Sequence, residues 1–197
     1  MSDFEAIWLE QALHGDDDAF AQLVETYQRP VFNLCYRMLG DPQEAEDAAQ
    51  ESFWRAYQAL HRYDPNRKFS TWLLSIAAHY CIDQQRKRHI VSVPMDIVFE
   101  ETFADRSPNP EHAVESSEED RMLHALMNAM NSQDRAALVL RYWYGFSDVE
   151  ISEALSLSVS AVKSRLYRAR QQLAQDLQAV HQESLTAEEE YYGSPTF

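Results

Sequence analysis

A hydroxyl-rich and basic helix is predicted near the carboxyl end of the chain, over residues 158–173. Val162, Leu166 and Ala169 recur there at helical spacing and would form its buried stripe. Hydroxyl and basic side chains on the remaining surface can bond to DNA phosphates and to base edges in the major groove. The residues with this chemistry are Ser160, Lys163, Ser164, Arg165, Tyr167 and Arg168.

This helix follows a shorter predicted helix and a tight turn. Ser147, with Glu150 three residues later, forms a capping box that starts the first helix. The run Ser156-Leu157-Ser158 interrupts the apolar pattern, and its last serine can cap the second helix. Two helices joined in this way indicate a helix-turn-helix that reads duplex DNA. The alternative is an amphipathic helix pair whose basic face is only solvated.

A second group of candidate residues lies in the first half of the chain. Residues 63–68 form a polar loop, and the helix that follows, capped by Ser70 or Thr71, ends in a basic run. Basic groups bind phosphates and aromatic rings stack on bases, so the mixture is typical of a surface for a single strand or an unstacked base. The alternative is that Trp72 and Tyr80 belong to the core. The candidates are Asn66, Arg67, Lys68, Trp72, His79, Arg86, Lys87 and Arg88.

An acidic helix is predicted over residues 42–60. Asp41 and Pro42 give a strong start signal, and small apolar residues such as Ala45 and Ala48 can pack. Acidic and amide side chains crowd the opposite side, among them Glu46, Asp47 and Gln50. This side is either a solvated acidic face or a docking surface for a basic partner helix.

The whole chain is strongly acidic, which at first argues against DNA binding. It has 32 Asp and Glu against 17 Lys and Arg, a net charge of −15 in 197 residues. Local patches nevertheless decide contacts within a Debye length of ~8 Å. The basic residues cluster at 86–88 and 163–170. We therefore expect weak DNA binding by the protein alone and stronger binding when a partner holds it in place.

Catalytic, metal and cofactor sites are not expected. The sequence contains no metal-ligand spacing, no glycine-rich phosphate loop and no nucleophile motif, and its 7 His are scattered. Cys35 and Cys81, the only cysteines, lie in apolar helical segments and are predicted to be buried thiols. No signal peptide or long apolar run is visible, so we expect a cytoplasmic protein.

Helical periodicity throughout the chain predicts an all-α protein with two small helical domains. In the first helix, Phe4, Ile7, Trp8 and Ala12 or Leu13 are expected to pack, and Pro30 should kink or break the second. Residues 90–118 lack periodicity, contain three prolines and are mostly acidic, as in an extended linker. The predicted domains are 1–90 and 119–180, with a linker at 91–118 and an acidic, flexible tail at 181–197.

These features, in this order, resemble the sigma-70 family, specifically the short extracytoplasmic-function sigma factors of bacteria. The stretch 44–53 resembles region 2.2, the stretch 69–88 resembles regions 2.3 and 2.4, and the stretch 150–170 resembles region 4.2. The resemblance covers about residues 16–177. Family members are not enzymes. They bind core RNA polymerase and direct it to promoter DNA, and an anti-sigma factor often holds them inactive.

The resemblance also implies functions for the candidate residues. Glu46, Asp47, Gln50 and Phe53 would dock on the polymerase. The loop at residues 63–68 and the helix at 72–88 would read the minus-ten element and help to melt it, and the helix at 158–173 would read the minus-thirty-five element. Ser156 replaces the usual turn glycine, and a positive φ there would cost about 1 kcal/mol. The other hypothesis is a stand-alone helix-turn-helix regulator with a helical sensor domain.

Overall fold

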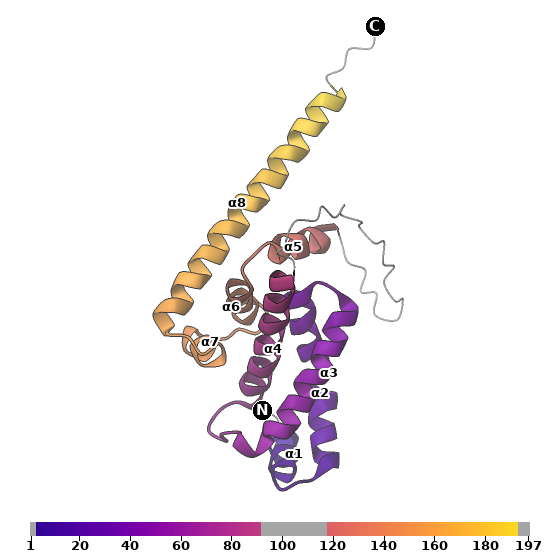
Figure 1. Ribbon diagram of the computed structural model, residues 1–197, viewed down its shortest axis with the longest axis vertical. Coiled ribbons are helices and arrows are strands. Elements are labelled where there is room, and N and C mark those ends of the chain that lie inside the picture. Colours follow the sequence, from indigo (N-terminus) through magenta and orange to yellow (C-terminus); the bar gives the residue numbers. More distant parts are fainter. Residues whose placement is uncertain (1–2, 92–117, 193–197) are drawn as a thin grey trace.

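Helices make up every regular element in the described part of the chain, which confirms the predicted all-α class. The computed structural model describes residues 3–91 and 118–192 (Figure 1). The predicted linker therefore lies almost wholly outside the described residues. In chain order the elements are α1 (Asp3–Leu13), α2 (Asp17–Leu39), α3 (Pro42–Ala59), the short 3-10 helix η1 (Leu60–Arg62), α4 (Phe69–Val91), α5 (Glu118–Asn128), α6 (Ser132–Tyr142), α7 (Asp148–Ala154) and α8 (Val159–Tyr192).

The first four α-helices form one packed unit around α2. This helix contacts α1, α3 and α4, and α3 also contacts α4. Asp16 caps α2 by accepting a hydrogen bond from Ala19 N at 3.0 Å, and Asp41 caps α3 with a 2.9 Å bond from Glu44 N. Gly40 ends α2 with φ of 81°, in the left-handed region. The predicted boundary between these two helices is confirmed.

Two other expectations for this unit are wrong in part. α2 continues through Pro30 without a break, because proline removes a single intrahelical hydrogen bond and the apolar residues on both sides of it stay packed. In α1, Phe4 and Ile7 are exposed. The predicted packing of Ala12, Trp8 and Leu13 is confirmed, and the helix also buries Leu9, which was not predicted.

The two cysteines lie next to each other in the core of this unit. Cys35 on α2 and Cys81 on α4 are both free and fully buried. The Cys81 thiol donates a hydrogen bond to the neighbouring Cys35 sulfur, and this bond, followed by burial, raises the pKa of Cys81. The predicted burial is confirmed, and sequence spacing gave no sign that the two thiols would meet.

Helices α5 to α8 form a second unit. α6 contacts α7 and α8, and α7 contacts α8. Asn131 caps α6 by accepting from Gln133 N at 3.0 Å. The far end of α8 extends beyond the other helices (Figure 1). Its backbone is helical to Tyr192, so helix continues into the segment expected to be a flexible tail.

The two units pack against each other in the free protein. α4 contacts α6 and α7, and α2 contacts α5 and α6. The buried apolar residues of both units join in one core cluster. Sequence patterns left this arrangement open, because a linker such as 91–118 permits many.

Candidate nucleic-acid interface

A helix-turn-helix is formed by α7, a short turn and α8. Ser147 Oγ accepts from Glu150 N at 3.2 Å, and Ser147 N donates to Glu150 Oε2 at 2.8 Å, which is the predicted capping box. Ser156 has φ of 55°, the strained value expected where glycine is usual. Ser158 Oγ accepts from Ala161 N at 3.2 Å and caps α8. The local structure follows from the sequence at each of these points.

The amino-terminal half of α8 presents an exposed polar face. Val162, Leu166 and Ala169 are buried, as predicted, and fix the rotation of the helix. Positions 160, 163, 164 and 167 then share the opposite side, since three or four residues separate neighbours on a helix face. The exposed side chains there are Ser160, Lys163, Ser164 and Tyr167.

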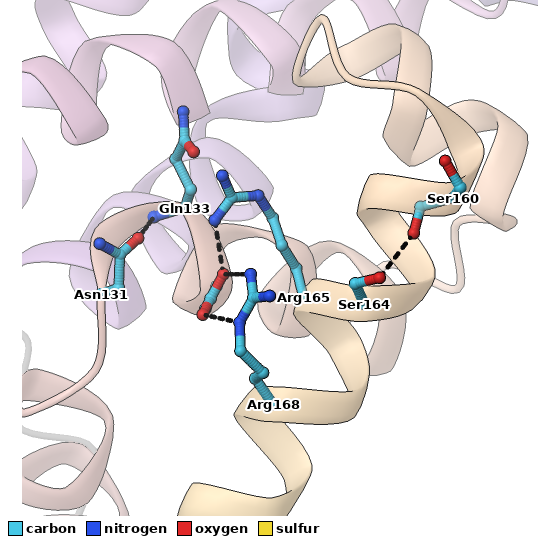
Figure 2. A network of polar contacts seen from close by, with 7 residues as sticks. Asn131, Gln133, Ser160, Ser164, Arg165 and Arg168 are labelled. Carbon is cyan, nitrogen blue, oxygen red and sulfur yellow. Dashed lines mark hydrogen bonds and ion pairs between the residues drawn. The ribbon is translucent and has the colours of Figure 1, made fainter.

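The two arginines predicted for the same surface are instead held by a carboxylate. Arg165 Nη1 donates to Asp134 Oδ1 at 2.7 Å, and Arg168 Nε lies 3.4 Å from Asp134 Oδ2. Figure 2 shows both guanidinium groups turned toward the carboxylate on α6. Arg165 is largely enclosed, whereas Arg168 remains more than half exposed. Arg168 is therefore the better placed of the two to reach DNA, because its own side chain stays exposed while it is paired with Asp134.

Asp134 was missed by the sequence reasoning. Its only local signal is an acidic residue in the first turn of α6, where the helix dipole favours negative charge. Asp134 and Arg165 are 31 positions apart in the sequence, so their hydrogen bond depends on how α6 packs against α8.

The loop at residues 63–68 is folded tightly by its own polar groups. Asp64 Oδ1 accepts from Asn66 N at 3.0 Å and from Asn66 Nδ2 at 2.9 Å. The bond from the Asn66 backbone is the main reason why the pKa of Asp64 is lowered. The Tyr63 hydroxyl donates to the carbonyl of Arg67. The turn leaves Asn66, Arg67 and Lys68 exposed at the surface.

Both loop cations are paired with acids of the other unit. Lys68 Nζ lies 3.0 Å from Glu150 Oε1, and Arg67 Nη2 lies 3.6 Å from Glu153 Oε2. The hydrogen bond from the Ser147 backbone, and then that from Lys68, lower the pKa of Glu150. Glu150 therefore both caps α7 and binds the loop.

The remaining minus-ten candidates lie along α4. Positions 72, 79 and 86 share one face of the helix. Trp72 is half-buried, with its ring centre 5.2 Å from that of Tyr63, so it belongs partly to the core. His79 is exposed, and its Nδ1 lies 2.9 Å from the carbonyl of Ser75. The helix begins at Phe69, so neither Ser70 nor Thr71 is its cap.

The basic end of α4 carries three different environments. Arg86 lies 4.0 Å from Asp83, one helical turn earlier. Arg88 is paired with Glu44 at the start of α3. Lys87 is exposed. The structure thus leaves Arg86 and Lys87 at the surface and turns Arg88 toward α3.

The acidic helix α3 presents Asp47 and Gln50 to solvent, while Glu46 and Phe53 are half-buried. Trp54 is 56% exposed beside them and was missed. Its signal was present in the sequence, because positions 47, 50 and 54 share one helix face. Its indole lies over Tyr57, with 6.1 Å between ring centres. An exposed tryptophan next to acidic side chains is typical of a protein interface.

Two family profiles match the chain at these same units. Sigma-70 region 2 matches residues 23–89, and Sigma-70 region 4 matches residues 120–173. The ECF RNA polymerase sigma factor SigW of Bacillus subtilis (strain 168) is 38% identical over 177 residues, which covers 86% of this chain and 94% of SigW. The chain belongs to the ECF sigma factors of the sigma-70 family. It is a transcription initiation factor that directs RNA polymerase to promoters, and not an enzyme.

Other relatives agree with this membership. The RNA polymerase sigma-H factor of Pseudomonas aeruginosa is 32% identical, over 89% of this chain and 95% of its own length. The solved structure of CnrH in complex with the cytosolic domain of CnrY has a TM-score of 0.66 and 26% identity, and it covers 90% of this chain and 99% of CnrH. These matches do not favour a stand-alone regulator.

The partners of this ECF sigma factor are core RNA polymerase and promoter DNA. No helix in the described residues is long and apolar enough to cross a membrane.

Proposed function

We propose that α8 reads the minus-thirty-five element through its exposed face. The observation that carries this proposal is the separation of its two sides, with Val162, Leu166 and Ala169 buried and Ser160, Lys163, Ser164 and Tyr167 exposed. Hydroxyl groups can donate to or accept from base edges, and lysine can bind phosphate. Arg168 joins this face when it leaves Asp134. Arg165 positions α8 on α6.

The minus-ten element is assigned to the loop at residues 63–68 and to the exposed face of α4. Melting unstacks bases at a cost of a few kcal/mol per step, so the protein must offer replacement contacts. Asn66, Arg67 and Lys68 can hold the strand. The partly exposed ring of Trp72 and the exposed imidazole of His79 can stack on bases. Arg86 and Lys87 extend the basic surface, and Arg88 contributes if it leaves Glu44.

Core polymerase is assigned to the outer face of α3. Asp47 and Gln50 are exposed and Glu46 is partly exposed, so they can meet a basic helix. Phe53 packs on the core and supports this face, and Trp54 adds an apolar anchor. Because RNA polymerase acts in the cytoplasm, the protein is assigned there too. An anti-sigma factor is a further proposed partner, as the family membership implies, and CnrH was likewise solved with a protein partner, the cytosolic domain of CnrY.

The test is run-off transcription with purified core polymerase on genomic promoter fragments from the source organism. Specific transcripts should appear only when the protein is added. Asp47→Lys should weaken polymerase binding at least tenfold, because it reverses a charge at the docking face. Glu10→Lys, an exposed reversal on α1, is the matched control and should bind normally.

Promoter reading is tested separately from docking. Lys163→Ala should reduce transcription while polymerase affinity stays unchanged. Unaltered transcription with Lys163→Ala and with Ser164→Ala would refute the assignment of α8. Equal polymerase affinity of Asp47→Lys and Glu10→Lys would refute the assignment of α3.

A further inference from the structure

Two neighbouring residues, Tyr63 and Asp64, fix the shape of the loop at residues 63–68. Asp64 Oδ1 accepts from the backbone and the side chain of Asn66, and the Asp64 carbonyl accepts from Arg67 N at 3.0 Å. A side-chain oxygen that binds the backbone two residues ahead forms an Asx turn, which aspartate and asparagine both stabilise. One exposed carboxylate therefore sets the position of Asn66 and of the start of the basic run.

Tyr63 holds the same loop from its buried side. The residue is 6% exposed, and its hydroxyl donates to the carbonyl of Arg67. Burial raises the pKa of Tyr63, so the hydroxyl keeps its proton at neutral pH and remains a donor. Its ring lies edge-on to two others, with 5.7 Å to the ring centre of Phe69 and 5.2 Å to that of Trp72. Tyr63 thus joins the end of the loop to the ring proposed to stack on bases.

Phe69 connects the loop to the body of the first unit. It is 2% exposed, and its ring centre lies 5.5 Å from that of Tyr27 on α2. The hydroxyl of Tyr27 in turn donates to Glu5 on α1 at 2.5 Å. Since all these contacts lie within the first unit, they hold the loop without help from the ion pairs to α7.

The charge of Asp64 is unfavourable in a loop assigned to a DNA strand. The bonds from Asn66, and to a smaller extent the charge of Arg67, lower the pKa of Asp64, so its carboxylate is ionised at neutral pH. A negative charge repels phosphates, whereas the bonds that this carboxylate accepts place side chains that can bind them. The two effects are separable, because asparagine keeps the acceptor oxygen and removes the charge.

We propose that Asp64 and Tyr63 are positioning residues for the minus-ten strand, which hold Asn66 and Arg67 in the DNA-binding conformation before DNA is present. The proposal rests on the proposed assignment of residues 63–68. A loop that is already ordered loses less conformational entropy on binding, so the same contacts give a higher affinity. Affinity for the strand therefore depends on the acceptor oxygen at position 64 and not on its charge.

The experiment compares Asp64→Ala with Asp64→Asn in the full-length protein. Both substitutions remove the same charge, but only asparagine retains an oxygen that can accept from the backbone of Asn66. Fluorescence anisotropy at low salt measures binding to a mixed-sequence single-stranded 20-mer and to the same sequence as a duplex. The duplex is the control, because duplex DNA is assigned to α8 and not to this loop.

Asp64→Asn should bind the single strand at least as tightly as the unaltered protein does. Asp64→Ala should bind it about three- to tenfold more weakly than Asp64→Asn, because its loop must become ordered on binding. Affinity for the duplex should be equal in the two variants. Tyr63→Phe, which keeps the buried ring, should also weaken binding of the single strand and leave binding of the duplex unchanged.

Two results would overturn the proposal. One is a single-strand affinity of Asp64→Ala equal to or above that of Asp64→Asn, since the charge alone would then account for the effect of this residue. The other is an equal loss of affinity for the single strand and the duplex, which would indicate general damage to the protein.

Arg67→Ala tests the assignment of the loop itself. It should weaken binding of the single strand about threefold or more, because one phosphate contact is lost. Unchanged binding would refute the assignment of residues 63–68 to DNA. If Arg67→Ala weakens binding while Asp64→Ala and Asp64→Asn bind equally, the assignment stands and the positioning proposal fails.

Discussion

The two DNA-binding units both hold arginine or lysine against carboxylates, but they do so in different ways. In the second unit, Asp134 binds Arg165 and Arg168 within the unit, and the pair with Arg165 is mostly buried. In the first unit, Arg67 and Lys68 bind Glu153 and Glu150 of the other unit, and these pairs are exposed.

Burial decides what each kind of pair can do. An enclosed pair is costly to break, because either charge alone would lack both water and partner. An exposed pair contributes little and exchanges readily with other ions. Asp134 therefore fixes α8 in place, whereas the exposed pairs leave Arg67 and Lys68 able to exchange their carboxylates for another anion, which is DNA under the proposed assignment.

The largest effect is expected from Asp134→Ala. It leaves Arg165 enclosed without its carboxylate, and removing one partner of a buried pair costs about 3–5 kcal/mol. Because Arg165 is partly exposed, we expect about 2–3 kcal/mol less free energy of unfolding for the unit that contains α6 and α8. Urea denaturation measures the change. If the free energy of unfolding fell by less than ~0.5 kcal/mol, the enclosed pair of Asp134 and Arg165 would contribute no more than an exposed pair.

Lys163→Ala should have the next largest effect, on promoter use and not on stability. Lys163 is exposed on α8, away from Asp134. Loss of one phosphate contact should reduce transcription about five- to tenfold, corresponding to ~1–1.4 kcal/mol, and lower the salt dependence of binding. The run-off assay and thermal melting separate the two effects. A lower melting temperature would indicate a packing contact instead.

Acidification should weaken the cap of α7. The folded-state pKa of Glu150 is lowered, so its carboxylate stabilises the fold above the ordinary pKa of about 4.3 and loses this effect as pH falls through the folded-state value. Glu150→Gln cannot titrate. Its melting temperature should fall less than that of the unaltered protein between pH 6 and pH 3.5. If the melting temperatures of the two proteins fell equally with pH, Glu150 would not be the group whose protonation weakens the cap.

Glu153→Gln should have the smallest effect on stability. Its ion pair with Arg67 is exposed on both sides and 3.6 Å long, so its loss should change the free energy of unfolding by less than ~0.5 kcal/mol. The change should be larger in low salt than at 0.5 M salt, where exposed charges are screened. Urea denaturation at the two salt concentrations measures this dependence.

Local signals in the sequence predicted much of the fold. The predicted caps at Asp41, Ser147 and Ser158 are present, and Ser156 adopts a positive φ at the position where glycine is usual. These features depend on bonds between residues within a few positions of each other. Where packing competes with a local signal, packing decides, as in the uninterrupted helix through Pro30 and the exposed Phe4.

In the candidate sites, too, some features follow from local sequence and others from how the helices pack. The exposed face of α8 follows from its apolar stripe, because 3.6 residues per turn fix which side chains share a side. The contact of Asp134 with Arg165, that of Arg135 with Met38 and the loop pairs with α7 each join residues 31 to 97 positions apart. The periodicity of apolar residues in the sequence does not indicate contacts between residues so far apart.

The sequence by itself determined the helices, the helix-turn-helix and the order of the two sigma regions, since these depend on short-range bonds and on apolar spacing. The tertiary structure alone decided which charges are available to DNA. The residue type sets the sign of each charge. Whether that side chain can bind DNA depends on its distance to an opposite charge and on its shielding from water. Arg165 and Lys163, two residues apart on α8, therefore differ in what they can bind.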